Sequence, residues 1–262
     1  MAGSSRIGCL ACVLAALVWT DAGRTQCRPD VSGSREVQYR LTVVSREFDF
    51  VIHLRPDLKQ RAGEEIEGYC EAPGEVIIYR KGSTKPLQTI GMRDIFVSLK
   101  NSGEPLTNSA QLYDDQGVVN AGDFNFDGHE DFAVQNGNHG PYGAPSYDVY
   151  LFSPVKGQFE LSHPLTHLIE QTLGFFQIDP VHKHLVTRSK SGALYHEMTT
   201  YAVIHDKPVL IMREIEDGSK DTRYVYVTKK RLVNGKWQST TRRYSQATYY
   251  EKETSSSDAV SP

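Results

Sequence analysis

The sequence lacks the features that mark several large classes of protein. No apolar run among the 262 residues reaches the roughly 18 residues that a membrane-spanning helix needs, which excludes a multi-span membrane protein. Lysine and arginine total 29 against 32 acidic residues, so the positive excess typical of a nucleic-acid binder is absent. The 21 glycines and the hydrophobic share of 39% are close to globular averages, which excludes a collagen or a wholly disordered chain.

Recognisable catalytic patterns are also absent. His196-Glu197 is not followed by the second histidine of an H-E-x-x-H metal site, and there is no P-loop or G-x-S-x-G turn. The sequence therefore predicts a protein that is not an enzyme. Because acidic residues are plentiful, a carboxylate pair of the glycosidase type remains an open alternative.

The first segment has the pattern of an export signal. Arg6 is followed by an apolar stretch from Ile7 to Trp19, and small residues at Thr20 and Ala22 precede a cut before Gly23. We therefore expect a periplasmic or secreted protein with a signal peptide at 1–22. The alternatives are a short helix of a cytosolic protein and a lipoprotein, the latter disfavoured because no suitable cysteine follows the apolar run.

Cysteine usage agrees with export. Of the four cysteines, only Cys27 and Cys70 would remain after cleavage, and an oxidising compartment would pair them as a disulfide. The alternative is two unrelated buried thiols.

The mature chain consists of segments rich in β-branched and aromatic residues, separated by turn-forming residues. This pattern predicts strands and an all-β fold. We expect an antiparallel sandwich or a propeller-like β-domain, preceded by a small N-terminal β-region. The expected units are a β-region at 23–106, a calcium-binding β-domain at 107–245 and a disordered tail at 246–262. One short helix is expected within His167–Gly174, and the expected strands are Val37–Val44, Phe48–Leu54, Glu75–Arg80, Pro86–Ile90, Asp94–Lys100, Asp131–Gln135, Ser146–Phe152, Gln158–Leu161, His184–Arg188, Met198–His205, Val209–Ile215 and Tyr224–Val233.

The sharpest local motif is D-x-N-x-D-G-x-x-D, which begins at Asp123. Calcium takes six to eight oxygen ligands, and alternate residues of a tight loop can direct several oxygens to one centre. The expected ligands are the side chains of Asp123, Asn125, Asp127 and Asp131 and the carbonyl of His129. Position twelve is Val134 and not the glutamate of an EF-hand, so the motif looks like the calcium turn between strands of integrin-type repeats. The alternative is an Asx-rich turn without a metal.

Two further segments consist of loop-forming residues. Residues 136–145 form a run of turn formers beside the motif, which is either a binding loop or a simple connection. Residues 188–195 join two expected strands, and Tyr195 supplies a large ring with a polar end, a residue type suited to interfaces. Taken alone, this second segment reads as a plain hairpin loop.

Together, the export signal, the calcium motif followed by F-A-V-Q-N-G, the strand S-Y-D-V-Y-L-F and the loop S-G-x-x-Y resemble a known family. They are similar to the periplasmic immunity proteins that neutralise peptidoglycan-cleaving effectors of type IV secretion systems, which in turn resemble inhibitors of invertebrate-type lysozyme. The resemblance covers about residues 107–244. It implies a bound calcium and a loop that blocks a muramidase active site. The residues it implicates are Ser191, Gly192 and Tyr195, with Tyr201 behind them, and Lys190 would add charge complementarity toward an acidic cleft.

The function expected from the sequence is therefore an exported, calcium-stabilised inhibitor whose partner is a muramidase. The alternative is an integrin-like calcium-binding module for adhesion or envelope scaffolding, which would bind a surface ligand and leave wall hydrolases unaffected. A carbohydrate hydrolase is a third interpretation.

Overall fold

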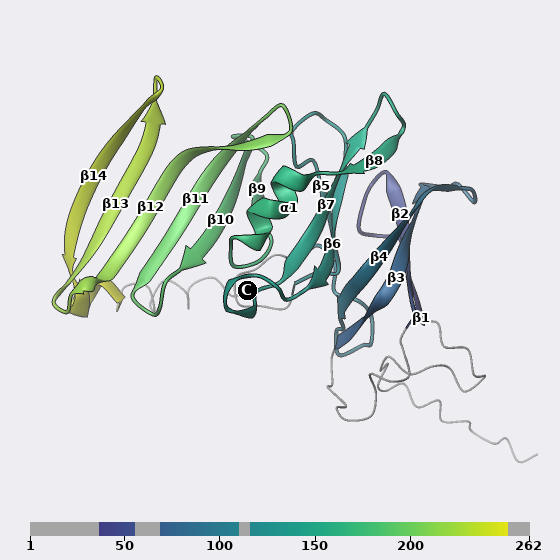
Figure 1. Cartoon of the computed structure of the whole chain (residues 1–262), viewed down its shortest axis with the longest axis horizontal. Helices are drawn as coiled ribbons and strands as arrows, with labels where there is room; N and C mark the ends of the chain where they lie inside the picture. The colour runs from purple at the N-terminus through teal and green to yellow at the C-terminus, as the bar shows by residue number, and fades with distance from the viewer. Residues whose placement is uncertain (1–36, 56–68, 110–115, 251–262) are drawn as a thin grey trace, which may run out of the picture.

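The computed structural model describes residues 37–55, 69–109 and 116–250, and three antiparallel sheets account for most of them (Figure 1). The all-β prediction is confirmed. The first sheet has the order β1-β2-β3-β4, and its strands are β1 (Val37–Leu41), β2 (Phe48–Leu54), β3 (Tyr69–Arg80) and β4 (Pro86–Ser98). The expected hairpin loop at 81–85 joins β3 to β4.

The second sheet lies in the middle of the molecule and has the order β5-β6-β7-β8. Its strands are β5 (Val119–Gly122), β6 (Asp131–Gly137), β7 (Ser146–Ser153) and β8 (Gln158–Leu161). Helix α1 (His163–Glu170) follows β8 and contacts β7. It is the expected short helix, but it begins four residues before His167, where the sequence suggested its start. Pro164 explains this start, because proline is favoured in the first turn of a helix.

The third sheet has the order β14-β13-β12-β11-β10-β9, and β12, β13 and β14 form the edge farthest from the other two sheets (Figure 1). Its strands are β9 (Gln177–Asp179), β10 (His184–Lys190), β11 (Tyr195–Ile204), β12 (Lys207–Asp221), β13 (Tyr224–Val233) and β14 (Lys236–Ser245). Residues 246–250, at the start of the expected tail, are helical, and 251–262 lie outside the described residues.

The middle sheet is apolar on both faces. Alternate residues of a strand point to opposite sides, and its strands carry apolar residues at consecutive positions. On β7, Tyr150 and Phe152 belong to a core shared with the first sheet, whereas Tyr147, Val149 and Leu151 belong to a core shared with α1 and β10. The expected β-region at 23–106 thus packs its buried face directly on the expected calcium-binding unit, and the two share one apolar core.

The remaining expectations about the chain ends fall largely on residues that the structure does not describe. The signal peptide at 1–22 and Cys27 lie outside the described ranges, while Cys70 is buried on β3, so the disulfide stays a prediction. No helix in the described ranges is long and apolar enough to span a bilayer.

Candidate functional site

The calcium motif forms the turn between β5 and β6. Gly122 ends β5 and Asp131 begins β6, so the motif bridges two neighbouring strands. Gly128 has a φ of +94°, a left-handed conformation that glycine adopts without steric cost. Phe124 anchors the turn, because its fully buried ring packs edge-on against Phe176 at a centroid distance of 5.3 Å.

The carboxylates of the turn accept hydrogen bonds from its own backbone. Oδ1 of Asp123 accepts from the Asp127 amide at 3.0 Å, and Oδ2 accepts from the Gly128 amide at 2.9 Å. Oδ1 of Asp127 accepts from the His129 amide at 2.9 Å. These bonds hold the acidic side chains on the inside of the turn. They are compatible both with a metal loop and with an Asx turn that binds no ion.

Asp131 is the most deeply buried carboxylate of the motif, with an exposed fraction of 2%. Its Oδ2 accepts from the Phe124 amide at 2.8 Å, and its Oδ1 accepts from the Phe152 amide at 2.9 Å. Burial raises the pKa of Asp131 to about 8, and the negative charges of Asp127 and Asp123 add to that rise against the two amide bonds. A divalent cation would stabilise the charged form of this group.

Sequence reasoning missed Asp206, which the fold brings to the motif. It lies in the turn between β11 and β12, where His205 and Asp206 both have positive φ values, at +51° and +61°. The amide Nδ2 of Asn125 lies 2.9 Å from Oδ1 of Asp206 and 3.1 Å from Oδ2 of Asp127. This amide therefore donates to two carboxylates and partly offsets the acidic charge. Asp206 is 81 residues from Asn125, and no local pattern indicates the contact.

The donors of the turn suit a hard cation by their chemistry, since all of them are oxygens. Within the described ranges, no three side chains of histidine, cysteine, aspartate or glutamate converge as a metal site. A calcium ion would thus also need the amide oxygen of Asn125 and the carbonyl of His129. The turn borders a pocket of about 350 Å³, which is lined by Asn125, Asp127, Leu151, Phe152, Ser153, Pro154, Glu160, Leu161, Ser162, Pro164, His205, Asp206 and Lys207.

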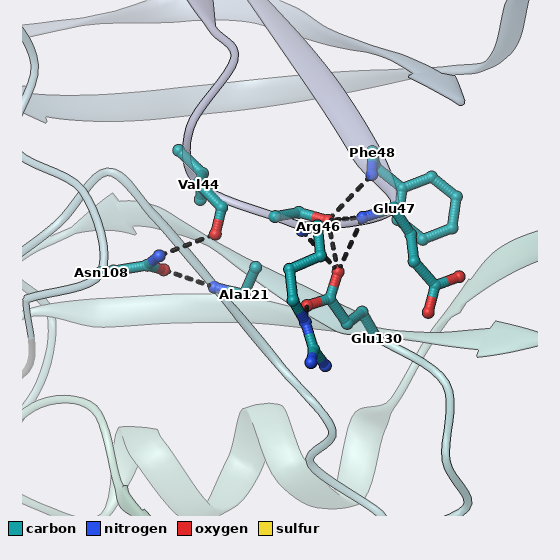
Figure 2. A network of polar contacts seen from close by, with 8 residues as sticks. Val44, Arg46, Glu47, Phe48, Asn108, Ala121 and Glu130 are labelled. Atoms are coloured by element: carbon teal, nitrogen blue, oxygen red, sulfur yellow. Dashed lines mark hydrogen bonds and ion pairs between the residues drawn. The ribbon is translucent and has the colours of Figure 1, made fainter. Parts of the chain in front are cut away.

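Glu130, inside the motif but not among its expected ligands, joins the turn to the first sheet (Figure 2). Its Oε2 accepts from the Ser45 hydroxyl at 2.6 Å and from the amides of Arg46 at 2.9 Å and Glu47 at 3.1 Å. Burial opposes its charge, but the hydrogen bonds from Ser45, Arg46 and Glu47 outweigh burial and lower its pKa. Asn108 makes a parallel link, because it donates to the Val44 carbonyl and accepts from the Ala121 amide.

The loop at 191–194 connects β10 to β11 and is exposed throughout. The Ser191 amide donates to the Tyr195 carbonyl at 3.0 Å, which closes the hairpin. Gly192 has a φ of +72°, and no other residue lies within 4 Å of where its Cβ would be, so the tip projects into solvent. Lys190, Ser191, Gly192 and Tyr195 are thus brought together.

Tyr142 braces this loop and was also missed as a site residue, although its segment, 136–145, was recognised as a loop. Its hydroxyl accepts from the Gly192 amide at 3.0 Å, and the Lys190 ammonium lies 4.9 Å from its ring centroid. Tyr142 itself is 66% exposed and has a φ of +60°. A residue held in an uncommon conformation by its surroundings is often part of a functional surface.

Tyr201 does not lie at the loop. It is further along β11, about 20 Å from Tyr195 at about 3.3 Å per residue, and it packs against the core that α1 covers. Burial raises its pKa and that of Tyr195. The structure therefore groups Tyr195 with the loop and Tyr201 with the core.

The acidic turn between β5 and β6 and the 191–194 loop lie near opposite ends of strand β11. Tyr195 begins β11, and Asp206, which contacts the acidic turn, follows its last residue, Ile204. A strand of 10 residues spans about 30 Å at about 3.3 Å per residue. A metal in the turn could therefore act on the loop only through the intervening sheet.

No protein-family model matches the chain, and no curated protein gives a significant match. One solved structure does match, described as "Structure of a Xanthomonas Type IV Secretion System related protein". Its TM-score is 0.60 at 22% sequence identity, and the match covers 82% of this chain and 97% of that one. At this identity the similarity shows a shared fold, and this chain has the fold of that Xanthomonas protein.

Proposed function

We propose that this protein is an exported, calcium-stabilised inhibitor of a peptidoglycan-cleaving muramidase, acting as an immunity protein. The observation that carries the proposal is the 191–194 loop, which is exposed throughout and is braced at Gly192 by the Tyr142 hydroxyl. A braced loop loses little conformational freedom when it binds, so more of its contact energy contributes to affinity.

The chemistry of the loop complements a muramidase cleft. Such a cleft contains two carboxyl groups and is shaped for a sugar ring. The Ser191 hydroxyl would donate a hydrogen bond to those carboxyl groups, and the Tyr195 ring would occupy a sugar subsite. Lys190, at the base of the tip, supplies positive charge that favours association with an acidic surface.

The similarity to a type IV secretion system related protein supports an association with that kind of system, and the expected signal peptide supports an envelope location. In the alternative, an integrin-like adhesion module, the loop would be a plain connection. The brace from Tyr142 to Gly192 favours the inhibitor, because a connection needs no such support.

Calcium in this proposal stabilises the fold. Asp123, Asn125, Asp127, Asp131 and the carbonyl of His129 would hold it. Because the turn also contacts the first sheet through Glu130 and the third sheet through Asp206, an ion there would tie all three sheets together. It would supply charge compensation for the buried Asp131 and take no part in the chemistry of the partner.

The test is lysis of peptidoglycan by a panel of muramidases, with the exported protein added. Ala193→Trp is the most informative variant, because Ala193 is an exposed residue of the tip and a large ring there would obstruct insertion. The matched control is Val155→Trp, because Val155 lies in the turn between β7 and β8 and is 95% exposed. We expect inhibition by the parent and by Val155→Trp, and its loss in Ala193→Trp.

Equal inhibition by both tryptophan variants would show that the loop does not insert. Absence of inhibition across the panel would count against an inhibitor and in favour of the adhesion alternative. Melting temperatures of all variants should agree, since both positions are exposed.

A further inference from the structure

The hairpin formed by β13 and β14, here called the basic hairpin (residues 224–245), has a charge pattern unlike the rest of the chain. It contains six lysines and arginines and no acidic residue, in a protein whose net charge is −3. The six cations are Lys229, Lys230, Arg231, Lys236, Arg242 and Arg243. Only Lys229 among them forms a salt bridge within the described residues, with Glu214 at 2.9 Å.

The tip of the basic hairpin projects beyond the strand that supports it. β13 pairs with β12 only as far as Arg231, which lies opposite Met212. Beyond that point Leu232 pairs with Trp237, and Val233 pairs with Lys236, across an Asn-Gly turn. In Figure 1 this turn lies at the outer corner of the third sheet, away from the other two sheets.

Apolar side chains and cations meet at this tip. Trp237 is 47% exposed, and Leu232 and Val233 are partly exposed. Since opposite residues share a face, Leu232 and Trp237 lie on one face with Lys230, whereas Val233 and Lys236 lie on the other with Arg231. Cations and apolar groups are thus present on both faces of the tip.

A flat protein partner would contact one face of a strand pair. A layer of lipid headgroups would instead surround the tip, placing phosphates near cations on both faces. Tryptophan has a marked preference for the membrane–water interface, where its ring is apolar and its N–H stays hydrated. Each lysine or arginine near an anionic bilayer adds to its affinity for that surface.

We propose that the tip of the basic hairpin docks on an anionic phospholipid bilayer. Trp237, Leu232 and Val233 enter the interfacial layer, and Lys230, Arg231 and Lys236 contact the phosphate headgroups. The protein would then associate with the membrane surface reversibly and without a spanning segment. This inference does not depend on the muramidase proposal.

The exposed hairpin loop between β3 and β4 offers a comparison. The loop between β3 and β4 contains Lys81 and Lys85, but it has only glycine, serine and threonine between them. Lys81 also pairs with Asp49 at 2.5 Å. This hairpin is basic without being apolar, and the proposal assigns it no role at a bilayer.

The test uses binding to phosphatidylcholine vesicles prepared with and without phosphatidylglycerol. Of the two tryptophans, Trp19 lies in the expected signal peptide, so in residues 23–262 Trp237 is the single tryptophan and reports on the tip. We expect co-flotation with the anionic vesicles only, together with a shift of Trp237 emission to shorter wavelength. Replacing Lys230, Arg231 and Lys236 by glutamine should weaken binding on the order of 100-fold at low salt.

The Lys85→Gln variant is the matched control and should bind like the parent. Three results would overturn the proposal: no binding to anionic vesicles, binding unchanged in the triple glutamine variant, or bound protein whose Trp237 emission does not shift. Retention by a purified acidic protein with no vesicle binding would reassign the tip to a protein partner. Because Lys85, Arg231 and Lys236 are exposed and Lys230 is partly exposed, circular dichroism should show unchanged folding.

Discussion

The contact between Glu130 and the turn at 42–47 provides the sharpest test of how the first and middle sheets are joined. In Glu130→Ala, the Ser45 hydroxyl and the backbone amides of Arg46 and Glu47 lose their shared acceptor. The Glu130 side chain is only 9% exposed, so water could not easily replace it.

The expected cost follows from hydrogen-bond energetics. A hydrogen bond to a charged group contributes about 1.5–3 kcal/mol, and a buried donor left unpaired costs about 1–3 kcal/mol. Since the three donors cluster and can partly rehydrate once the side chain is gone, we expect a total of about 3 kcal/mol. For a chain of this size, that lowers the melting temperature by about 6–12 °C. Arg46 contributes little through its own side chain, because that side chain is 89% exposed.

The assay is thermal and urea unfolding of the parent, Glu130→Ala and Arg46→Ala. We expect a large loss of stability for the first variant and a loss below about 1 kcal/mol for the second. A double-mutant cycle with Ser45→Ala should give a coupling of about 1–2 kcal/mol. The reasoning fails if Glu130→Ala melts within about 2 °C of the parent, or if Arg46→Ala costs as much.

Three further predictions concern the rest of the molecule. Gly74→Ala should destabilise by more than about 3 kcal/mol in urea unfolding, because its Cβ would lie 2.1 Å from the His53 carbonyl oxygen, whereas Gly91→Ala on the neighbouring strand meets nothing and should be nearly neutral. Calorimetry should show a higher melting temperature with calcium than with chelator, because calcium at 100 times its Kd adds about 2.7 kcal/mol to the free energy of unfolding. Asp127→Asn should remove most of that difference, and equal melting in both conditions would contradict a metal role. Tyr142→Phe should weaken muramidase inhibition about fivefold and speed amide exchange in the 191–194 loop, and unchanged exchange would show that the hydroxyl is no brace.

The strands that the sequence predicted are those with apolar alternation. Phe48–Leu54, Gln158–Leu161 and Tyr224–Val233 have the expected bounds. β14 was missed because it is polar and exposed along its whole length, so it carries no hydrophobic period. The Asn234-Gly235 turn that precedes it is a strong hairpin signal and could have indicated it.

The candidate site residues likewise divide into those that a local sequence pattern indicates and those that only the fold brings together. The acidic turn is local, so the residue types and spacing of one short segment were enough to single it out. Asp206, Tyr142 and Glu130 act through contacts 81, 50 and about 84 residues apart in the chain. Such contacts depend on how the three sheets pack, which the periodicity of one sequence does not encode.

The two-faced middle sheet has a consequence for how the chain reaches its folded state. β6 and β7 are buried almost along their whole length, so each has apolar side chains on both sides until two separate layers cover them. One layer comes from the N-terminal strands, and the other depends on α1 and β10, which are synthesised later. Between these two events β6 and β7 form a strand pair whose apolar side chains are exposed, and aggregation competes with folding at that stage. Refolding yield should therefore fall as the protein concentration rises, until α1 has docked on β7.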